Sequence, residues 1–315
     1  MSLNMARFEH AGRTGWGVVR GDVLLPVPGE FATTGEFIRS ADLAALRAFS
    51  GPTLPLSACT LLAPVTRNQQ FVCQGANYWQ HMIESGMDPD AQSFNMFFTK
   101  ASGCIVPATS DIVRPAHVRF LDYEIELGLV LRRDLSGPTA ITAANLHDYV
   151  AGITIVNDVS ARDVQIPQSQ FYKGKSYRTF GPVGPWLCLL DADDMQRLGA
   201  LELQLTVNGV TRQRDSTANL VHLPAPTLAE LSAMHDLFAG DLVSTGTPAG
   251  CALSIPSPRR QRLAALLPEA RKWAAFARAQ EARPYLQPGD VVEATIRSAD
   301  GAIDLGTQRN RVVAG

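Results

Sequence analysis

The sequence predicts a mostly β protein with a few helices, and three observations support this fold class. Short runs rich in aliphatic and β-branched residues recur from about residue 68 onward, bounded by turn-forming residues. Asn208-Gly209 separates two such runs, which is the strongest short-range signal for a hairpin. Helical patterns are fewer than strand patterns, so we expect sheets to form most of the core.

Residues 5–60 are expected to form a small N-terminal module. Two β-prone runs around Gly21-Asp22 predict a hairpin over 16–26, and a short helix is expected near 33–48. A proline-containing linker separates this module from a main domain over 68–315. In the main domain we expect strands at 70–74, 111–114, 121–131, 150–157, 185–190, 201–214, 241–245 and 290–297.

Two segments of the main domain predict short helices. Thr227 and Glu230 form a capping-box pattern, which predicts a helix from Thr227 to about Phe238. Residues 142–147 are expected to form another short helix.

Composition and charge exclude several classes of function. The chain has 315 residues, of which 46% are hydrophobic and 18% charged, and its net charge is −2. This balance argues against nucleic acid or an anionic membrane as a partner. No apolar run is long enough to span a bilayer, and no signal-peptide pattern is found at the start. The five cysteines show no C-x-x-C spacing, so we expect a cytoplasmic protein without disulfides or a thiolate zinc site.

Two glutamates, Glu124 and Glu126, stand two residues apart in the expected strand 121–131. Side chains alternate along a strand, so both carboxylates point the same way and repel each other unless a cation lies between them. Asp158 follows an apolar run as a third acid. Three oxygen ligands without a cysteine suit Mg²⁺ or Mn²⁺ better than zinc. The alternative is an exposed strand face with two solvated glutamates.

His81 and Glu84 are three residues apart and share a face if this segment forms a helical turn. Glu84 can then hold the imidazole and raise its basicity, as a general base requires. A surface His–Glu pair without a catalytic role is the alternative.

Arg162 and Gln165 lie within one turn of each other, shortly after Asp158. Arg162 can bind a substrate carboxylate with two hydrogen bonds, and Gln165 can donate a hydrogen bond to a developing oxyanion. Pairing of Arg162 with Asp163 or another acid is the structural alternative.

Further along the chain, Lys175 is one of two lysines that can offset the charge of a carboxylate cluster. The glycine-rich turn 244–250, which includes Gly246 and Thr247, can bring backbone N–H groups to an anionic ligand. The turn lacks the sequence of a P-loop, so a nucleotide site is not indicated.

Together and in this order, these motifs resemble the fumarylacetoacetate hydrolase superfamily, in particular its acylpyruvate hydrolases and 2-hydroxyhepta-2,4-diene-1,7-dioate isomerases. The resemblance covers about residues 68–313, and the N-terminal module resembles the variable leader of the family. The chain differs by having Ala101-Ser102 where the family often has Pro-Pro, and Arg178 where it often has Asp. The matching motifs are Asn77-Tyr78-x-x-His81, Phe98-Thr99-Lys100, Asp122-Tyr123-Glu124-x-Glu126, Asn157-Asp158-Val159-Ser160-Ala161-Arg162-Asp163, Lys175-Ser176-Tyr177, Thr245-Gly246-Thr247-Pro248-Ala249-Gly250, Pro288-Gly289-Asp290-Val291-Val292 and Arg309-Asn310-Arg311-Val312-Val313.

The resemblance implies a mixed β-sandwich roll, usually dimeric, in which the three acids hold Mg²⁺, Mn²⁺ or Ca²⁺. His81 with Glu84 would form the base dyad on a mobile lid, and Lys175 would be a third catalytic residue. The implied substrate-binding residues are Arg162, Gln165, Tyr78, Gly246 and Thr247.

The implied substrates are 2-oxo or 1,3-dioxo acids, which can chelate a metal through a carboxylate and the adjacent carbonyl. We therefore expect a divalent-metal-dependent hydrolase that cleaves a carbon–carbon bond in such an acid, in aromatic or amino-acid catabolism. An isomerase or decarboxylase acting on 2-hydroxy-dienedioates or oxaloacetate is the alternative, because the same enolate serves these reactions. A non-catalytic metal-binding β module is more remote, since it would need the acids alone. The expected partners are a small 2-oxo acid and a second copy of the chain, with no nucleic acid and no membrane.

Residues 257–284 are rich in Arg and Ala and form an insert between two strand-like segments. Apolar residues at near-helical spacing predict one or two amphipathic helices, broken at Pro268. We expect Leu263, Leu266, Trp273 and Phe276 to pack beside the pocket or against a second subunit. Such packing would favour a bulky or extended acyl group on the substrate.

Overall fold

A computed structural model of the protein describes residues 2–90, 94–256 and 266–315. Over these residues the strands form a 13-stranded sheet, a five-stranded sheet and a two-stranded ladder, which confirms the mostly β fold. The path of the large sheet is β4 (Leu54–Pro55), β3 (Val23–Pro26), β2 (Arg13–Arg20), β1 (Leu3–His10), β15 (Leu187–Leu189), β12 (Val150–Asn157), β11 (Ile125–Leu131), β18 (Leu242–Ser244), β6 (Phe71–Gly75) and β7 (Met96–Lys100).

Three more strands join the large sheet off this path, where β5 pairs with β1, β14 with β12, and β8 with β14. Their bounds are β5 (Thr60–Leu62), β14 (Gly181–Val183) and β8 (Ile105–Pro107). The small sheet has the order β17 (Val210–Ser216), β16 (Leu201–Val207), β19 (Val291–Ser298), β20 (Asp304–Ala314) and β9 (Ile112–Arg114). The ladder joins β10 (Leu121–Asp122) to β13 (Ser160–Ala161).

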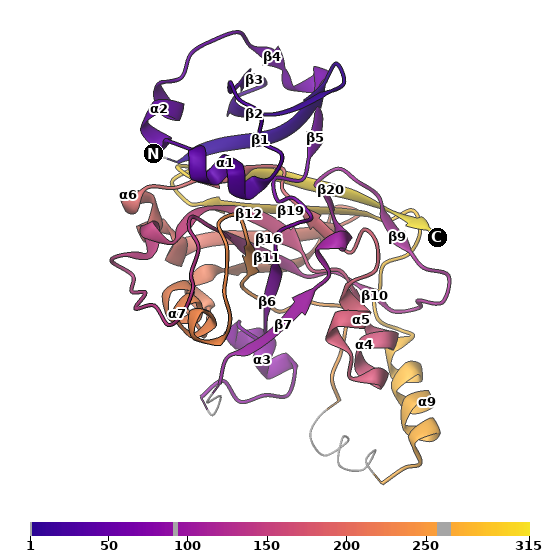
Figure 1. Ribbon diagram of the computed structural model, residues 1–315. Helices are drawn as coiled ribbons and strands as arrows, with labels where there is room; N and C mark the ends of the chain where they lie inside the picture. The colour runs from indigo at the N-terminus through magenta and orange to yellow at the C-terminus, as the bar shows by residue number, and fades with distance from the viewer. Residues whose placement is uncertain (1, 91–93, 257–265) are drawn as a thin grey trace.

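Short helices decorate the sheets. The α-helices are α1 (Thr34–Ser40), α2 (Leu43–Ala48), α3 (Trp79–Glu84), α4 (Arg162–Gln168), α5 (Phe171–Lys175), α6 (Ala192–Met195), α7 (Pro224–Met234) and α9 (Glu269–Gln280). Single 3₁₀ turns are η1 (Leu56–Ala58), η2 (Ser102–Cys104), η3 (Leu146–Asp148), η4 (Gln196–Ala200) and η5 (Thr217–Asn219). In Figure 1, α3, α4, α5 and α9 lie at the end of the molecule away from the N-terminal strands. In the described part of the chain, no helix is both long and apolar enough to cross a membrane.

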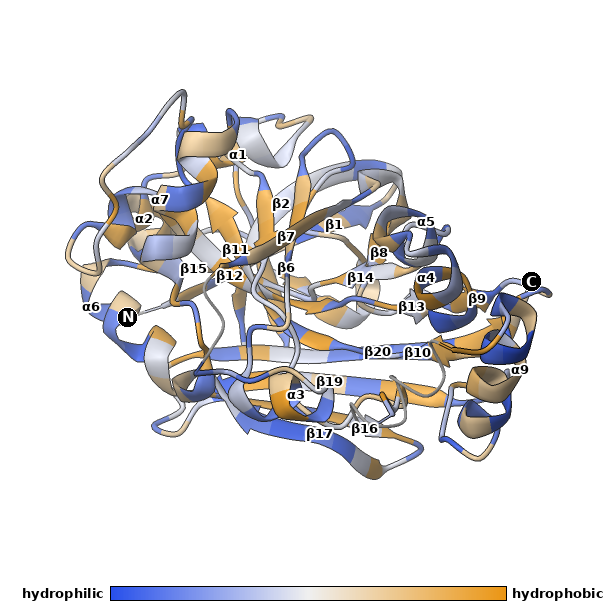
Figure 2. Cartoon of the chain, turned by 90° about the horizontal axis from the view of Figure 1, so that it is seen from below, coloured by the Kyte–Doolittle hydropathy of each residue, from blue (hydrophilic) through white to orange (hydrophobic). Residues whose placement is uncertain are grey.

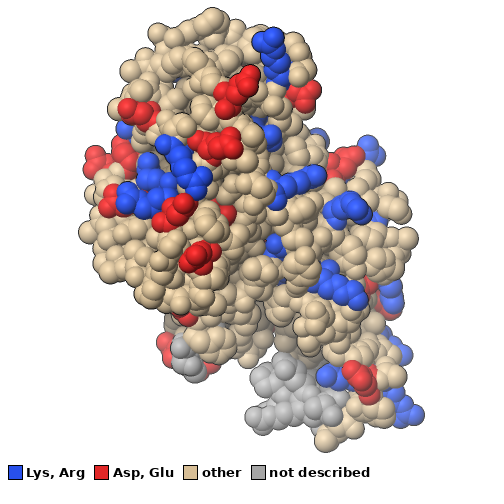
Figure 3. All heavy atoms as spheres, in the orientation of Figure 1, with Lys and Arg blue, Asp and Glu red and all other residues tan. Residues whose placement is uncertain are grey.

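Strands β11 and β12 form the centre of the core. Every residue of both strands is buried, because other parts of the protein cover both faces of the large sheet here. One cover is the small sheet: the Gln308 side chain on β20 donates hydrogen bonds to the carbonyl oxygens of Pro182 and Gly184, both at 3.2 Å. Figure 2 shows the central strands of the large sheet as mainly hydrophobic and the edge strand β17 as mainly hydrophilic. The face drawn in Figure 3 carries acidic and basic side chains interspersed, with no large area of one sign.

The N-terminal strands extend the large sheet. The hairpin expected over 16–26 is present as β2 and β3, and β1 pairs with β15 of the main sheet. The single helix expected near 33–48 is instead two helices. Asp42 separates them, because its side chain accepts hydrogen bonds from the backbone N–H groups of Ala44 and Ala45 and so begins α2.

The helix expected from Thr227 begins three residues earlier, at Pro224, and ends at Met234. The capping-box prediction is wrong because Thr227 is fully buried inside the helix. Its hydroxyl accepts hydrogen bonds from the amide groups of Gln74 at 3.0 Å and Asn95 at 3.2 Å. Residues 142–147 form only turns that lead into η3.

The insert contains one described helix, α9, which begins directly after Pro268 as expected. Residues 257–265, including Leu263, lie outside the described residues. Leu266, Trp273 and Phe276 do not line the cavity described below, and the Leu266 side chain is 82% exposed. These three residues therefore do not supply lining of the cavity, and their packing beside it or against a second subunit stays a prediction.

Candidate active site

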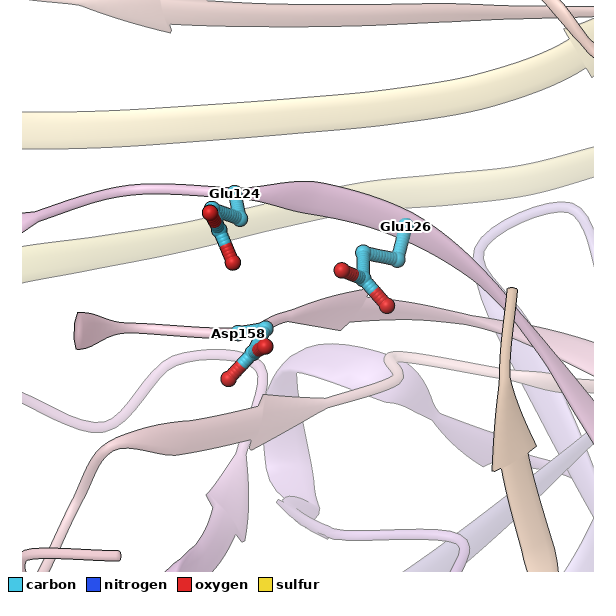
Figure 4. Close-up of side chains that lie close together, drawn as sticks. All are labelled: Glu124, Glu126 and Asp158. Carbon is cyan, nitrogen blue, oxygen red and sulfur yellow. The ribbon is translucent and has the colours of Figure 1, made fainter. Parts of the chain in front are cut away.

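Three buried carboxylates meet at the junction of β11 and β12. Glu124, Glu126 and Asp158 each offer an oxygen within 4.8 Å of the others. The antiparallel pairing of the two strands places Asp158 beside Glu124, since the Asp158 N–H donates to the Glu124 carbonyl oxygen at 2.8 Å. Figure 4 shows Glu124 and Glu126 projecting from one segment toward Asp158 on its neighbour. The alternative of an exposed strand face is wrong, because all three side chains are buried.

Two buried lysines contact this acid cluster. Lys100, the last residue of β7, donates to one oxygen of Asp158 and to the Phe180 carbonyl oxygen. Lys175, the last residue of α5, donates to the other oxygen of Asp158 and to Glu124, both at 2.5 Å. Burial acts to lower the pKa of Lys175, but Asp158 and Glu124 outweigh it and raise the pKa. Lys175 is therefore an ammonium ion at neutral pH.

Arg162, the first residue of α4, is bound on three sides. Its Nε donates to Asp122 at 2.8 Å, its Nη2 to Glu124 at 2.5 Å, and its Nη1 to the Gln165 side-chain oxygen at 2.8 Å. Pairing with Asp163 does not occur; instead Asp163 accepts a hydrogen bond from the Arg119 N–H. Asp122 also accepts hydrogen bonds from the backbone N–H groups of Ala252 and Leu253, and so links the segment after the glycine-rich turn to Arg162.

The surroundings of the two glutamates shift their pKa values in opposite directions. Burial acts to raise the pKa of Glu124, but Arg162 and Lys175 outweigh it and lower that pKa to about 2. Burial, together with Asp158 and Glu124, raises the pKa of Glu126 well above its usual range. Glu126 accepts hydrogen bonds from the Ser244 hydroxyl and the Gly246 N–H, but no lysine or arginine among the described residues forms an ion pair with it.

These residues fit a divalent cation. The acids supply three oxygen atoms within reach of one ion, and oxygen ligands are those that Mg²⁺, Mn²⁺ and Ca²⁺ prefer. Burial and the neighbouring acids disfavour the ionised form of Glu126, and the positive charge of a metal would stabilise it. Glu124, Glu126 and Asp158 are thus the residues that would hold the ion.

A cavity of about 160 Å³ opens beside the acids. Gln165, Thr247, Arg162 and Lys175 line it together with Glu124 and Glu126. Tyr78 does not, since its side chain is fully buried and its hydroxyl has no hydrogen-bond partner within the described chain.

His81 on α3 lines the same cavity. Its Nδ1 is buried and has no hydrogen-bond partner among the described residues. Burial lowers the pKa of His81 below its usual value of 6.5, so the imidazole is neutral at pH 7 and can accept a proton.

Glu84 lies on the same helix as His81 but contacts a different group. Its carboxylate accepts a hydrogen bond from the Gly250 N–H at 3.2 Å, and no hydrogen bond joins it to His81 in the described structure. Glu84 lines a second cavity of about 410 Å³ together with Arg212 and Arg283. Its role as the partner of His81 stays a prediction.

Gly246 has a backbone conformation that few other residues adopt. Its φ is +86°, and a Cβ atom at this position would lie 2.9 Å from the Asn77 Cβ. The turn brings the Gly246 N–H to 3.1 Å from Glu126. Thr247 instead faces inward, donating to the Ile125 carbonyl oxygen and accepting from Gln213.

Sequence reasoning missed Lys100 and Asp122 as parts of the site. A lysine at the end of a strand that contains two phenylalanines, Met96–Lys100, is a signal, because a buried lysine needs an acidic partner. Asp122 stands two residues before Glu124 and continues the same alternation of acids.

Comparisons with known proteins identify the family of the chain. The fumarylacetoacetate (FAA) hydrolase C-terminal family matches residues 70–313, and an Rv2993c-like N-terminal family matches residues 5–64. A Burkholderia cenocepacia protein, provisionally named a hydrolase, is 38% identical over 229 residues, covering 71% of this chain and 78% of that protein.

Two solved structures resemble the protein over nearly its whole length. Fumarylacetoacetate hydrolase from Exiguobacterium antarcticum has a TM-score of 0.75 and 28% identity, covering 99% of this chain and 100% of that chain. The 2-hydroxyhepta-2,4-diene-1,7-dioate isomerase from Mycobacterium marinum has a TM-score of 0.72 and 26% identity, covering 99% and 98%. With the family match extending over most of the sequence, the protein belongs to the fumarylacetoacetate hydrolase family.

Proposed function

We propose that the protein is a divalent-metal-dependent hydrolase that cleaves a carbon–carbon bond in a 2-oxo or 1,3-dioxo acid, in aromatic or amino-acid catabolism. One observation carries this proposal: Glu124 and Glu126 of the acid triad line the same cavity as His81, whose Nδ1 has no hydrogen-bond partner among the described residues. A metal site and a general base side by side suit hydrolysis of a chelating substrate.

The charges of the site favour an anionic substrate. The site holds four carboxylates and three cations. Asp122, Glu124 and Asp158 form ion pairs with Lys100, Arg162 and Lys175, and Glu126 lies within 4.8 Å of the other two triad acids. With all groups ionised this part of the described chain carries a net charge of −1. A divalent ion changes it to +1, and the carboxylate of a 2-oxo acid then balances it.

The residues have distinct tasks in the cleavage of an acylpyruvate. His81 Nδ1 takes a proton from water while the water oxygen adds to the acyl carbonyl carbon. The bond between that carbon and the methylene then breaks, and its electron pair passes into the enolate of pyruvate. A proton returned from His81 to the enolate carbon completes a carboxylic acid and pyruvate. A bound Mg²⁺ or Mn²⁺ would supply Lewis-acid stabilisation of the enolate.

Arg162 and Lys175 orient the negatively charged end of the substrate, because both ammonium and guanidinium groups line the cavity. The Gln165 oxygen accepts from Arg162, which leaves its NH₂ group to donate to a substrate oxygen.

Isomerisation is the second candidate, because the Mycobacterium marinum isomerase shares the fold over 99% of this chain. An isomerase moves a proton without breaking a carbon–carbon bond and needs no water attack. Decarboxylation of oxaloacetate would use the same enolate.

The deciding experiment is a substrate panel with the purified protein and Mg²⁺ or Mn²⁺. Acylpyruvates, oxaloacetate and 2-hydroxy-dienedioates are followed by ultraviolet absorbance and by chromatographic detection of pyruvate, acids and carbon dioxide. Metal-dependent release of equal amounts of pyruvate and carboxylic acid is expected. Turnover of the dienedioate alone, without bond cleavage, would replace hydrolysis by isomerisation.

We also propose that the protein acts in the cytoplasm as a homodimer. Light scattering after size-exclusion chromatography, over a tenfold range of protein concentration, measures the assembly. A mass of one chain at every concentration contradicts the dimer.

A further inference from the structure

The wall of the active-site cavity away from the acids is apolar. Residues from α4, α5, β7, the segment after α3 and the loop after Gly250 all contribute to it. Phe98 and Phe171 pack on each other with ring centroids 5.2 Å apart, and Lys175 Nζ lies 5.0 Å from the Phe98 ring. The large apolar side chains in the wall are Met87, Met96, Phe98, Ile166, Phe171, Leu253 and Ile255.

The cationic side chains that line the cavity already form ion pairs with the acids of the site. Among the described lining residues, Arg162 and Lys175 are the only Lys or Arg. Arg162 binds Asp122 and Glu124, while Lys175 binds Glu124 and Asp158. A substrate carboxylate at the metal can share these groups, but a second carboxylate against Met87 or Ile255 would be buried without a partner.

We propose that the substrate is a monoacid, a 2,4-dioxo acid whose acyl group carries an apolar chain. This inference rests on the proposed function and narrows it, because it excludes substrates with a carboxylate at the far end of the acyl group. The cavity volume of about 160 Å³ suits a short chain, since an apolar cavity of roughly 150 Å³ holds a benzene-sized group.

Among the described residues, Arg212 and Arg283 supply positive charge in the second cavity. Leu253 lines both cavities, so a long diacid could reach these arginines only by passing this leucine. Glu84 also lines the second cavity and offsets part of its charge. The test therefore includes substitution of these arginines, to detect a second carboxylate that binds in the neighbouring cavity.

The first measurement compares two substrates of equal size and shape. 7-Methyl-2,4-dioxooctanoate ends in an isopropyl group, and 2,4-dioxoheptanedioate ends in a carboxylate in its place. We expect kcat/KM to be about 100-fold higher for the monoacid, because the carboxylate loses hydration without gaining a cation. Lengthening the acyl group from acetyl to butanoyl should raise kcat/KM about fourfold per methylene. Equal or better use of the diacid overturns the proposal.

A second measurement uses ligands that cannot be cleaved. Calorimetry with Mn²⁺-loaded protein compares 6-methyl-2-oxoheptanoate with 2-oxohexanedioate. Tighter binding of the monoacid supports the proposal even if no dioxo acid is hydrolysed, in which case only the proposed reaction fails. Equal binding, or tighter binding of the diacid, overturns it.

Variants test which residues cause the preference for the monoacid over the diacid. Met87 is half-buried, so Met87→Lys can place an ammonium group at the wall and should reduce the preference for the monoacid at least about tenfold. Met87→Leu, which keeps an apolar wall, should leave the preference unchanged. A preference for the diacid that disappears in Arg212→Gln or Arg283→Gln would overturn the proposal and assign the second carboxylate to the neighbouring cavity.

Discussion

The ammonium group of Lys175 lies 2.5 Å from a carboxylate oxygen of Glu124. This contact places a positive charge at the edge of the acid triad and helps to lower the pKa of Glu124. The pKa of Glu126 is instead raised by burial and by the two neighbouring acids. The two glutamates are therefore expected to respond differently to substitution.

Replacing Glu126 by glutamine should stabilise the protein in the presence of a chelator and abolish its response to metal. Glutamine keeps an oxygen for Ser244 and Gly246 but removes the charge that burial and the neighbouring acids oppose. Thermal unfolding with and without Mn²⁺ measures both effects. Wild-type protein should gain melting temperature with Mn²⁺, while Glu126→Gln should start higher and gain little.

The exposed Glu202 on β16 offers a matched control, and Glu202→Gln should behave as the wild type. An unchanged metal response in Glu126→Gln would remove Glu126 from the metal site. Chelation should also abolish turnover, with recovery on addition of Mg²⁺ or Mn²⁺.

His81→Ala should lower kcat by roughly 10²–10⁴ without changing the metal-induced rise in melting temperature. Loss of a general base affects proton transfer and leaves the acid triad intact. His235→Ala, at a half-buried histidine that does not line the cavity, is the control. Normal turnover in His81→Ala would show that the histidine is structural.

The pH dependence of kcat/KM should report His81. Burial lowers its pKa below 6.5, and the neutral form is the active base, so activity should fall only as the pH drops through that lowered pKa. Because the unfolded chain takes up this proton at higher pH than the folded chain, stability should also decrease below pH 6.5. The acid limb of the kcat/KM profile should be absent from the residual activity of His81→Ala.

Lys100→Met should destabilise the fold by about 3–5 kcal/mol, because it removes one partner of a fully buried ion pair with Asp158. Urea unfolding measures this change. Lys173→Met, at an exposed position on α5, should cost little. Equal stability of the two variants would mean that Lys175 alone compensates Asp158.

Gly246→Ala should cost about 1–3 kcal/mol and weaken metal binding. The added methyl group meets Asn77, and the φ of +86° is unfavourable for alanine. The displaced turn then withdraws its N–H from Glu126. Gly199→Ala, where a Cβ atom meets nothing within 4 Å, is the control, and similar behaviour of both variants would contradict the argument.

The acid triad could be predicted because its evidence is local. Glu124 and Glu126 follow the two-residue period of a strand, and Asp158 directly follows the adjacent strand β12. The partners of the acids could not be predicted in the same way. Lys100 reaches Asp158 from a strand that is 58 residues away in the chain, a contact made only by the tertiary fold.

Local rules also failed where a side chain had a distant partner. Thr227 has the sequence context of a helix cap, but the amides of Gln74 and Asn95 hold it inside the helix. For Thr227, hydrogen bonds across the fold therefore decided the outcome. Glu84 has the spacing of a partner for His81; its carboxylate accepts a hydrogen bond from the Gly250 N–H, and its role beside His81 stays a prediction.

The pairing of β1 with β15 joins Leu3–Met5 to residues 187–189. During synthesis on the ribosome, β1 is made roughly 10–40 s before β15, at translation rates of about 5–20 residues per second. Until then the edge of β1 that β15 later covers is open to other chains, which makes it a site where nascent copies can aggregate. Expression at low temperature, or with chaperones that bind extended segments, should therefore raise the yield of native protein by protecting this strand.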